Sequence, residues 1–158
     1  MYQKILVPLD GSPLSETALG IALPLAHRHG ASVDILHVHA TPALAGVART
    51  YDTRLDAELR NAMNSDQSAL ADRCTLESGV LVSAVFLEGE VIATLAEYAE
   101  RSSPDIVVMT THGRSGFSKL WLGSVTDAIV RKLKSPVLVV PGSKHNHATD
   151  FKTGKPHG

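Results

Sequence analysis

Five short aliphatic runs, separated by longer segments with helical spacing of apolar residues, constrain the fold of this chain more than any other feature. The runs are typical of buried β-strands, and they cover Lys4–Leu9, Ser32–Val38, Leu81–Leu87, Asp105–Thr110 and Val137–Val140. Because a helix-length segment lies between each run and the next, consecutive strands are expected to pair in parallel rather than as hairpins. The sequence therefore predicts an α/β fold.

The segments between these runs predict four helices. The first helix follows Ser12 and Pro13, a favourable cap and first residue, and ends at Gly30. The others are predicted at Arg54–Ser78, with an apolar face of Leu55, Leu59, Ala62, Met63, Ala69 and Leu70, at Val91–Arg101 and at Val125–Leu133. The stretch before Arg54 is expected to be a loop. Right-handed crossovers turn this order into a doubly wound, five-stranded parallel sheet with helices on both faces.

The composition is that of a single globular domain. The chain has 158 residues, of which 44% are hydrophobic and 20% are charged, so it can bury a core of ordinary size. Its net charge of -1 provides no basic excess, which a nucleic-acid or anionic membrane surface would need. We predict one domain over residues 1–142 and a disordered polar tail over residues 143–158.

The cellular location is predicted from the cysteine content and from the apolar segments. The single cysteine, Cys74, cannot form an intramolecular disulfide and is expected to be a packing residue. The chain passes from Met1 into the first strand without an apolar secretory segment. The longest nearly apolar stretch, Val80–Leu87, is far shorter than the roughly 20 residues of a membrane-spanning helix. We therefore expect a cytoplasmic protein without membrane insertion.

The carboxyl ends of the predicted strands are the expected place for a ligand. Doubly wound sheets bind ligands there, at the point where the winding of the chain reverses direction. In this sequence the rule selects the loops that follow Leu9, Val38 and Thr110.

The loop between Thr110 and the helix at Val125 contains glycines that allow close approach of a ligand to the backbone. Gly113 and Gly123 lack a Cβ, and the unpaired amides of Val125 and Thr126 at the helix start form a natural site for phosphate oxygens. Arg114 and Lys119 could add positive charge. An alternative is purely structural, because Ser124-x-x-Asp127 fits a helix capping box and glycines often end strands and helices. These local features support both alternatives equally.

A resemblance to a known family is carried by the same loop. The stretch Thr-His-Gly-Arg-Ser-Gly-Phe-Ser-Lys-Leu-Trp-Leu-Gly-Ser-Val, followed by Ser-Pro-Val-Leu-Val-Val, resembles the signature of the universal stress protein family. The opening Lys-Ile-Leu-Val-Pro-Leu-Asp-Gly-Ser is similar as well, so the resemblance covers about residues 1–142. Nucleotide-binding members carry a glycine, two residues, a second glycine, nine residues, and then glycine and serine or threonine. Gly113, Gly123 and Ser124 match that pattern, and Thr110 stands where the first glycine is usual.

The resemblance implies a ligand and a set of residues that bind it. It implies a Rossmann-like fold of the adenine nucleotide alpha hydrolase-like type, a role in stress response, and ATP or AMP as ligand, with Mg²⁺ accompanying ATP. The nucleoside end would be lined by Pro8, Leu9, Asp10 and Val38, and the ribose and phosphates by Thr110, Gly113, Arg114, Gly123, Ser124 and Val125. A homodimer that pairs the last strands is also implied, and an aliphatic edge such as Val137–Val140 is unfavourable if left unpaired.

The sequence favours binding over catalysis. The chain lacks the phosphate-binding Gly-x4-Gly-Lys-Ser/Thr motif, the Gly-x-Ser-x-Gly nucleophile turn and a Gly-x-Gly-x-x-Gly loop after the first strand, so we assign no catalytic residue. His37 and His39 alternate along one strand and could share a metal, but no third ligand is evident, and we assign no metal site. The alternatives are a nucleotide-free dimeric interaction module and a slow ATPase.

Overall fold

The computed structural model describes residues 1–40, 53–111 and 124–141, and in them strands and helices alternate as predicted. The elements are β1 (Lys4–Leu9), the 3₁₀ helix η1 (Ser15–Ala18), α1 (Leu19–His29), β2 (Ser32–His39), α2 (Thr53–Ser78), β3 (Val82–Glu88), α3 (Val91–Ser102), β4 (Ile106–Thr110), α4 (Ser124–Lys132) and β5 (Val137–Val140). Apart from the first helix, each predicted boundary lies within one residue of the observed one. The predicted disordered tail lies outside the described residues, as does most of the loop expected before α2.

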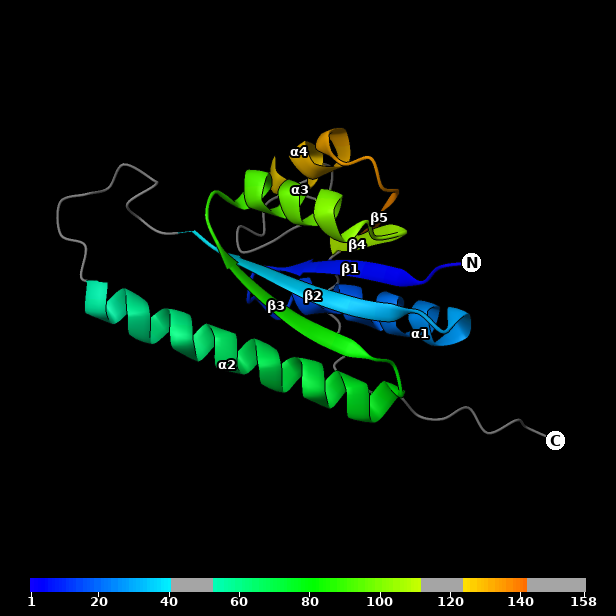
Figure 1. Ribbon diagram of the computed structural model, residues 1–158, viewed down its shortest axis with the longest axis horizontal. Helices are drawn as coiled ribbons and strands as arrows, with labels where there is room; N and C mark the ends of the chain where they lie inside the picture. Colours follow the sequence, from blue (N-terminus) through cyan, green and yellow to red (C-terminus); the bar gives the residue numbers. More distant parts are fainter. Residues whose placement is uncertain (41–52, 112–123, 142–158) are drawn as a thin grey trace.

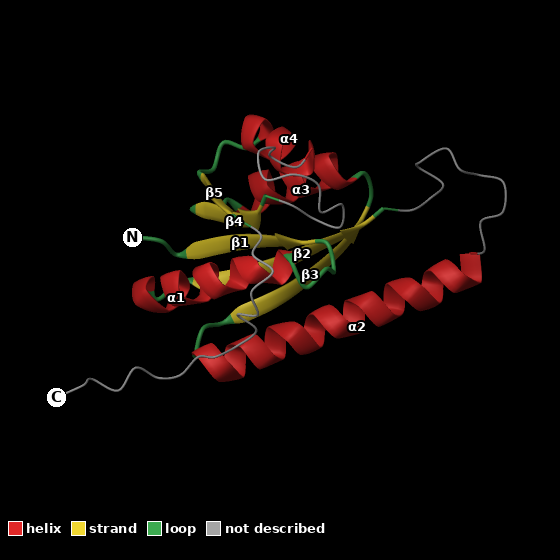
Figure 2. Cartoon of the chain, turned by 180° about the vertical axis from the view of Figure 1, so that it is seen from behind, coloured by secondary structure: helices red, strands yellow, loops and turns green. Residues whose placement is uncertain are grey.

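The five strands form one parallel sheet with the order β3-β2-β1-β4-β5. The chain moves outward from β1 to β3 and then returns to β4 on the other side of β1, so the predicted doubly wound topology is confirmed. Helices α1 and α2 cover one face of the sheet, and α3 and α4 cover the other (Figures 1 and 2). The winding therefore reverses between β1 and β4, which are neighbours at the centre of the sheet.

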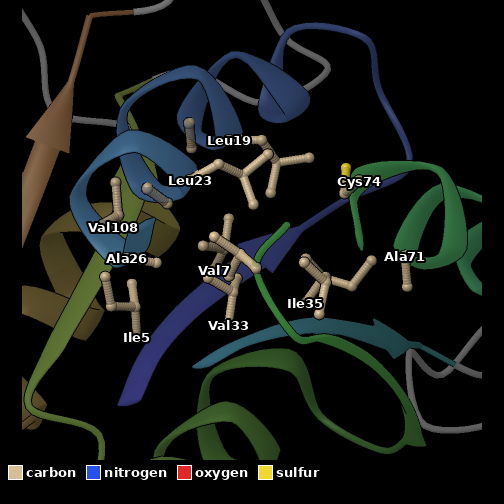
Figure 3. Close-up of a cluster of buried hydrophobic side chains, with 14 of the residues drawn as sticks. Ile5, Val7, Leu19, Leu23, Ala26, Val33, Ile35, Ala71, Cys74 and Val108 are labelled. Atoms are coloured by element: carbon tan, nitrogen blue, oxygen red, sulfur yellow. The ribbon is translucent and has the colours of Figure 1, made fainter. Parts of the chain in front are cut away.

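A separate apolar core fills the space on each face of the sheet. Successive side chains of a strand point to opposite faces, so Ile5 and Val7 pack under α1 whereas Leu6 packs under α3 and α4. Figure 3 shows the first core, in which Leu23 of α1 packs beside the strand residues. Ile129 of α4 is fully buried in the second core. Each such aliphatic side chain contributes about 1.5–3 kcal/mol of burial free energy, and the helices are fixed to the sheet in this way.

The start of the first helix differs from the prediction. We predicted an α-helix from Pro13 with Ser12 as its cap, but the 3₁₀ helix η1 comes first and α1 begins only at Leu19. The amide and the hydroxyl of Ser15 both donate to the carbonyl of Ser12, at 3.1 and 2.8 Å. Bonds that span three residues favour the tighter 3₁₀ turn. The predicted end is correct, because Gly30 follows α1 in the left-handed region at φ 66°.

The predicted apolar face of α2 is largely wrong. The buried residues of this helix are Gln67, Leu70, Ala71 and Cys74, whereas Leu55 and Leu59 are exposed. Only the second half of α2 packs on the core, since its first turns lie toward the carboxyl ends of the strands (Figure 1). The prediction that Cys74 is a packing residue is confirmed (Figure 3). In the part of the chain that the structure describes, no helix combines the length and the apolar character needed to cross a membrane.

Candidate functional site

A cavity of about 580 Å³ lies at the carboxyl ends of β1, β2 and β4, where the winding of the chain reverses. Its volume falls within the range of roughly 300–1,000 Å³ that is usual for small-molecule sites. The residues that line it come from the ends of β1, β2 and β4, from η1, and from the N-terminal halves of α2, α3 and α4. They are Pro8, Leu9, Asp10, Ser15, Leu36, His37, Val38, His39, Ala40, Asp56, Leu59, Met63, Val91, Leu95, Met109, Thr110, Ser124, Val125 and Thr126.

Most of the residues predicted for a ligand site lie together in this cavity. Seven of the ten line it, namely Pro8, Leu9, Asp10, Val38, Thr110, Ser124 and Val125. The other three, Gly113, Arg114 and Gly123, lie outside the described residues. The fold thus brings the ends of three strands and the start of α4 to one place, although these segments are far apart in the sequence.

The lining of the cavity differs between the two faces of the sheet. Leu36, Val38, Leu95 and Met109 belong to the apolar core under α3 and α4. The side toward α2 is mixed, because it carries the pair formed by His39 and Asp56 beside the apolar side chains of Leu59 and Met63. A ligand in the cavity would therefore find an apolar wall for a flat or aliphatic group and polar groups on the opposite side.

Asp10 is held in a fixed orientation by the turn that follows β1. One carboxylate oxygen, Oδ1, accepts hydrogen bonds from the amide of Ser12 at 2.9 Å and from the Ser12 hydroxyl at 2.5 Å. The Asp10 amide donates to Ser15 Oγ at 3.3 Å. This is the local pattern that makes aspartate a frequent turn residue. It places a carboxylate at the edge of the cavity at the end of the central strand.

The start of α4 is fixed against the end of β4. The hydroxyl of Thr126 donates to the carbonyl oxygen of Thr110 at 3.0 Å, and both residues are buried. Ser124 and Val125 precede this anchor and line the cavity. The first amides of an α-helix have no intrahelical partner, and the helix dipole is positive at this end, so anions are favoured here. Asp127, the acidic residue of the predicted capping box, forms an ion pair with Arg131 at 3.0 Å.

A part-buried pair of ionisable side chains lines the cavity and is missed by sequence reasoning. His39 Nε2 lies 2.9 Å from Asp56 Oδ1 and joins the end of β2 to the first turn of α2. The rings of His37 and His39 both stack on Phe86, with centroids 5.2 and 6.2 Å away. The alternation of His37 and His39 was visible in the sequence, but nothing there links them to Asp56. Within residues 1–40, 53–111 and 124–141, no three His, Cys, Asp or Glu side chains gather in a way that could hold a metal ion.

Comparisons with known proteins place the chain in a family. The model of the universal stress protein family matches residues 1–141. Universal stress protein MJ0531 of Methanocaldococcus jannaschii is 30% identical over 144 residues, which cover 91% of this chain and 85% of that protein. The solved structure of MJ0577 from the same organism has a TM-score of 0.67 and 27% identity, and the match covers 92% of this chain and 99% of that one.

A universal stress protein solved in complex with cAMP has a TM-score of 0.64 and 24% identity, with coverage of 90% of this chain and 98% of that one. This similarity supports a common fold. The match of the family model over residues 1–141 and the relative at 30% identity agree with the five-stranded architecture described above. This chain belongs to the universal stress protein family.

Proposed function

We propose that this protein binds an adenine nucleotide, ATP with Mg²⁺ or AMP, in the cavity at the carboxyl ends of β1, β2 and β4. The observation that carries the proposal is the convergence of Asp10, Val38 and Val125 on one cavity from three separate segments. Nucleotide occupancy would make the protein a nucleotide-dependent binding or signalling module in the stress response. The proposal does not require a catalytic residue.

The two sides of the cavity suit the two ends of a nucleotide. The nucleoside would lie beside Pro8, Leu9, Asp10 and Val38, where an apolar wall from the second core adjoins a fixed carboxylate. The phosphates would lie at the start of α4, beside Ser124 and Val125, because unpaired amides and the helix dipole favour anions there.

Three residues outside the described part of the chain belong to the same proposal, and the family pattern supports them. Gly113, Arg114 and Gly123 would complete the phosphate end together with Thr110. The structure solved with cAMP shows that the fold accommodates an adenine nucleotide in that protein.

The proposal is tested by placing a negative charge at the phosphate end. Val125→Asp introduces a carboxylate in the first turn of α4, where an acidic residue stabilises the helix itself. Two like charges about 4 Å apart repel by about 4 kcal/mol at an effective dielectric constant of 20. Even a third of this repulsion corresponds to about a tenfold loss of affinity. We expect calorimetric titration of the variant with ATP and with AMP to show at least this loss.

Val130→Asp is the matched control for this variant. Val130 lies on the same helix and is 41% exposed, close to the 38% of Val125, but it does not line the cavity. The control changes the net charge equally and is expected to keep the affinity of the unmodified protein. Equal affinities of the two variants would show that the phosphates do not bind at the start of α4. Absence of nucleotide binding by the unmodified protein would leave the fold as a nucleotide-free dimeric interaction module.

The assembly and location are part of the same proposal. Among the strands that the structure describes, β5 lies at the edge of the sheet and pairs with β4 alone, and Leu138 on it is exposed. An exposed aliphatic edge favours pairing with a second copy, so we propose a homodimer through Val137–Val140 in the cytoplasm. Light scattering is expected to give twice the mass of the chain for the unmodified protein. It is expected to give a single-chain mass for Leu138→Lys, and a dimer in that variant would contradict this interface.

A further inference from the structure

The first half of α2 presents apolar side chains to the cavity. Leu59 and Met63 line the cavity from this helix, and Leu59 is 54% exposed. Among the described residues, the buried members of α2 all lie in its second half, from Gln67 onward. An exposed leucine is common on protein surfaces, but the exposed surface of Leu59 is part of a cavity wall. It is therefore available to a ligand.

This wall lies at the end of the cavity opposite the proposed phosphate site. The start of α4 is fixed to the end of β4, because the hydroxyl of Thr126 donates to the carbonyl of Thr110. Helix α2 instead packs against β2 and β3, on the other side of β1 and on the other face of the sheet (Figures 1 and 2). A nucleotide whose phosphates lie at the start of α4 would therefore direct its base toward α2.

Two ion pairs hold this half of α2 against the strands. His39 Nε2 of β2 lies 2.9 Å from Asp56 Oδ1, and Arg60 Nη1 lies 2.8 Å from Glu88 Oε1 of β3. Asp56 precedes Leu59 by three residues, and Arg60 follows it directly. Because the two pairs attach the helix on both sides of Leu59, the wall is in place before a ligand enters. A wall that is positioned in advance lowers the ordering cost of binding.

The chemistry of the wall suits the flat face of a base better than a phosphate. The flexible thioether of a methionine such as Met63 makes favourable contacts with aromatic rings, and Leu59 gains from the covering of its apolar surface. A phosphate would find no hydrogen-bond donor on these two side chains, and burying it there would be unfavourable. His39 and Asp56 line the cavity as well, so polar groups are present for the edge of a base.

We propose that Leu59 and Met63 form a base-binding subsite, in which the first half of α2 covers one face of the adenine ring. The proposal rests on the nucleotide binding proposed above and assigns part of the affinity for the base to this helix. None of the residues predicted from the sequence for the ligand site belongs to α2, so the subsite adds a further element to the binding site.

Leu59→Ala tests the subsite, and Leu55→Ala is its matched control. Both leucines lie in the first half of α2 and are more than half exposed, but of the two only Leu59 lines the cavity. Alanine is the most favourable residue in a helix, so both variants are expected to fold. We expect calorimetric titration with ATP to show about fivefold weaker binding for Leu59→Ala, because roughly half of a leucine side chain would be covered by the base. Leu55→Ala is expected to keep the affinity of the unmodified protein.

AMP shows which part of the nucleotide the wall contacts. ATP and AMP carry the same base, so Leu59→Ala is expected to weaken the binding of both by the same factor. A clearly larger loss for ATP than for AMP would place the phosphates at α2 and contradict the subsite. An equal loss in Leu55→Ala and Leu59→Ala would show a general change at the start of the helix and contradict it as well.

A second pair of variants makes the same test at Met63. Met63→Ala is expected to weaken the binding of ATP and AMP equally, and it replaces Leu59→Ala if that variant does not fold. Met63→Leu keeps the volume of the side chain and is expected to keep most of the affinity. If the unmodified protein binds ATP and the alanine variants bind it equally well, the subsite is overturned and the proposed function stands. Absence of ATP binding by the unmodified protein would overturn both.

Discussion

A buried carboxylate on β2, away from the cavity, is stabilised by two neighbours. Asp34 accepts a hydrogen bond from the hydroxyl of Tyr98 at 3.0 Å, and Lys4 Nζ lies 3.6 Å from the same oxygen. Asp34 lies on the face of the sheet that α3 covers, because the side chains of β2 alternate. Burial of Tyr98 and its hydrogen bond to Asp34 raise the pKa of the tyrosine to about 12.

This arrangement predicts how Tyr98 ionises. Because its pKa in the folded protein lies above the ordinary value of 10, its contribution to stability is fully present below about pH 10 and is lost as the pH rises through about 12. The ultraviolet absorbance of tyrosinate is expected to show one of the three tyrosines titrating late, and Tyr98→Phe is expected to remove that late component. If the component missing in Tyr98→Phe is centred near the ordinary tyrosine pKa, the hydrogen bond to Asp34 does not have the effect described here.

The connection from β3 to α3 depends on a glycine beside the cavity. The amide of Gly89 donates to the carbonyl of His39 at 3.1 Å, and its φ of 151° lies where side chains are unfavourable. A Cβ at this position would also collide with Thr94 Oγ1. Glu90 follows as the cap of α3, with its carboxylate accepting from the amides of Ile92 and Ala93.

Gly89→Ala is therefore expected to be more destabilising than the same change at another positive-φ glycine. Gly30→Ala meets open space and incurs only the cost of the left-handed backbone, about 1 kcal/mol. For Gly89→Ala we expect a loss of about 2–3 kcal/mol in the free energy of unfolding, measured by urea denaturation. A smaller loss for Gly89→Ala than for Gly30→Ala would show that the connection relaxes around the added methyl group.

The secondary structure could be predicted from the sequence wherever burial follows local periodicity. The strand around Val107 is a continuous aliphatic run because both of its faces are covered, and its place between Pro104 and the glycine-rich loop defines its ends. The 3₁₀ helix η1 could not be predicted in this way, because it depends on the hydrogen bonds that the amide and hydroxyl of Ser15 donate to the carbonyl of Ser12. The exposure of Leu55 on α2 depends on which turns of the helix lie over the sheet. The spacing of apolar residues along the sequence does not show this.

At the scale of the whole molecule, topology explains why part of the site could be predicted. Alternation of strands and helices determines the winding, and the winding determines which strand ends meet, so Asp10, Val38 and Thr110 were expected in one place. The pair of His39 with Asp56 could not be predicted, because it requires the position of α2 over the sheet. The sequence thus reveals the residues at the strand ends more directly than it reveals the contact between β2 and α2.

A crystal structure grown with saturating ATP would show whether the cavity between β1, β2, β4 and the start of α4 holds the nucleotide. We expect the nucleoside to lie between Asp10 and Val38 and the phosphates to lie at the amides of Ser124 and Val125. A nucleotide bound elsewhere, or a cavity filled by the protein's own side chains in the presence of saturating ATP, would contradict it.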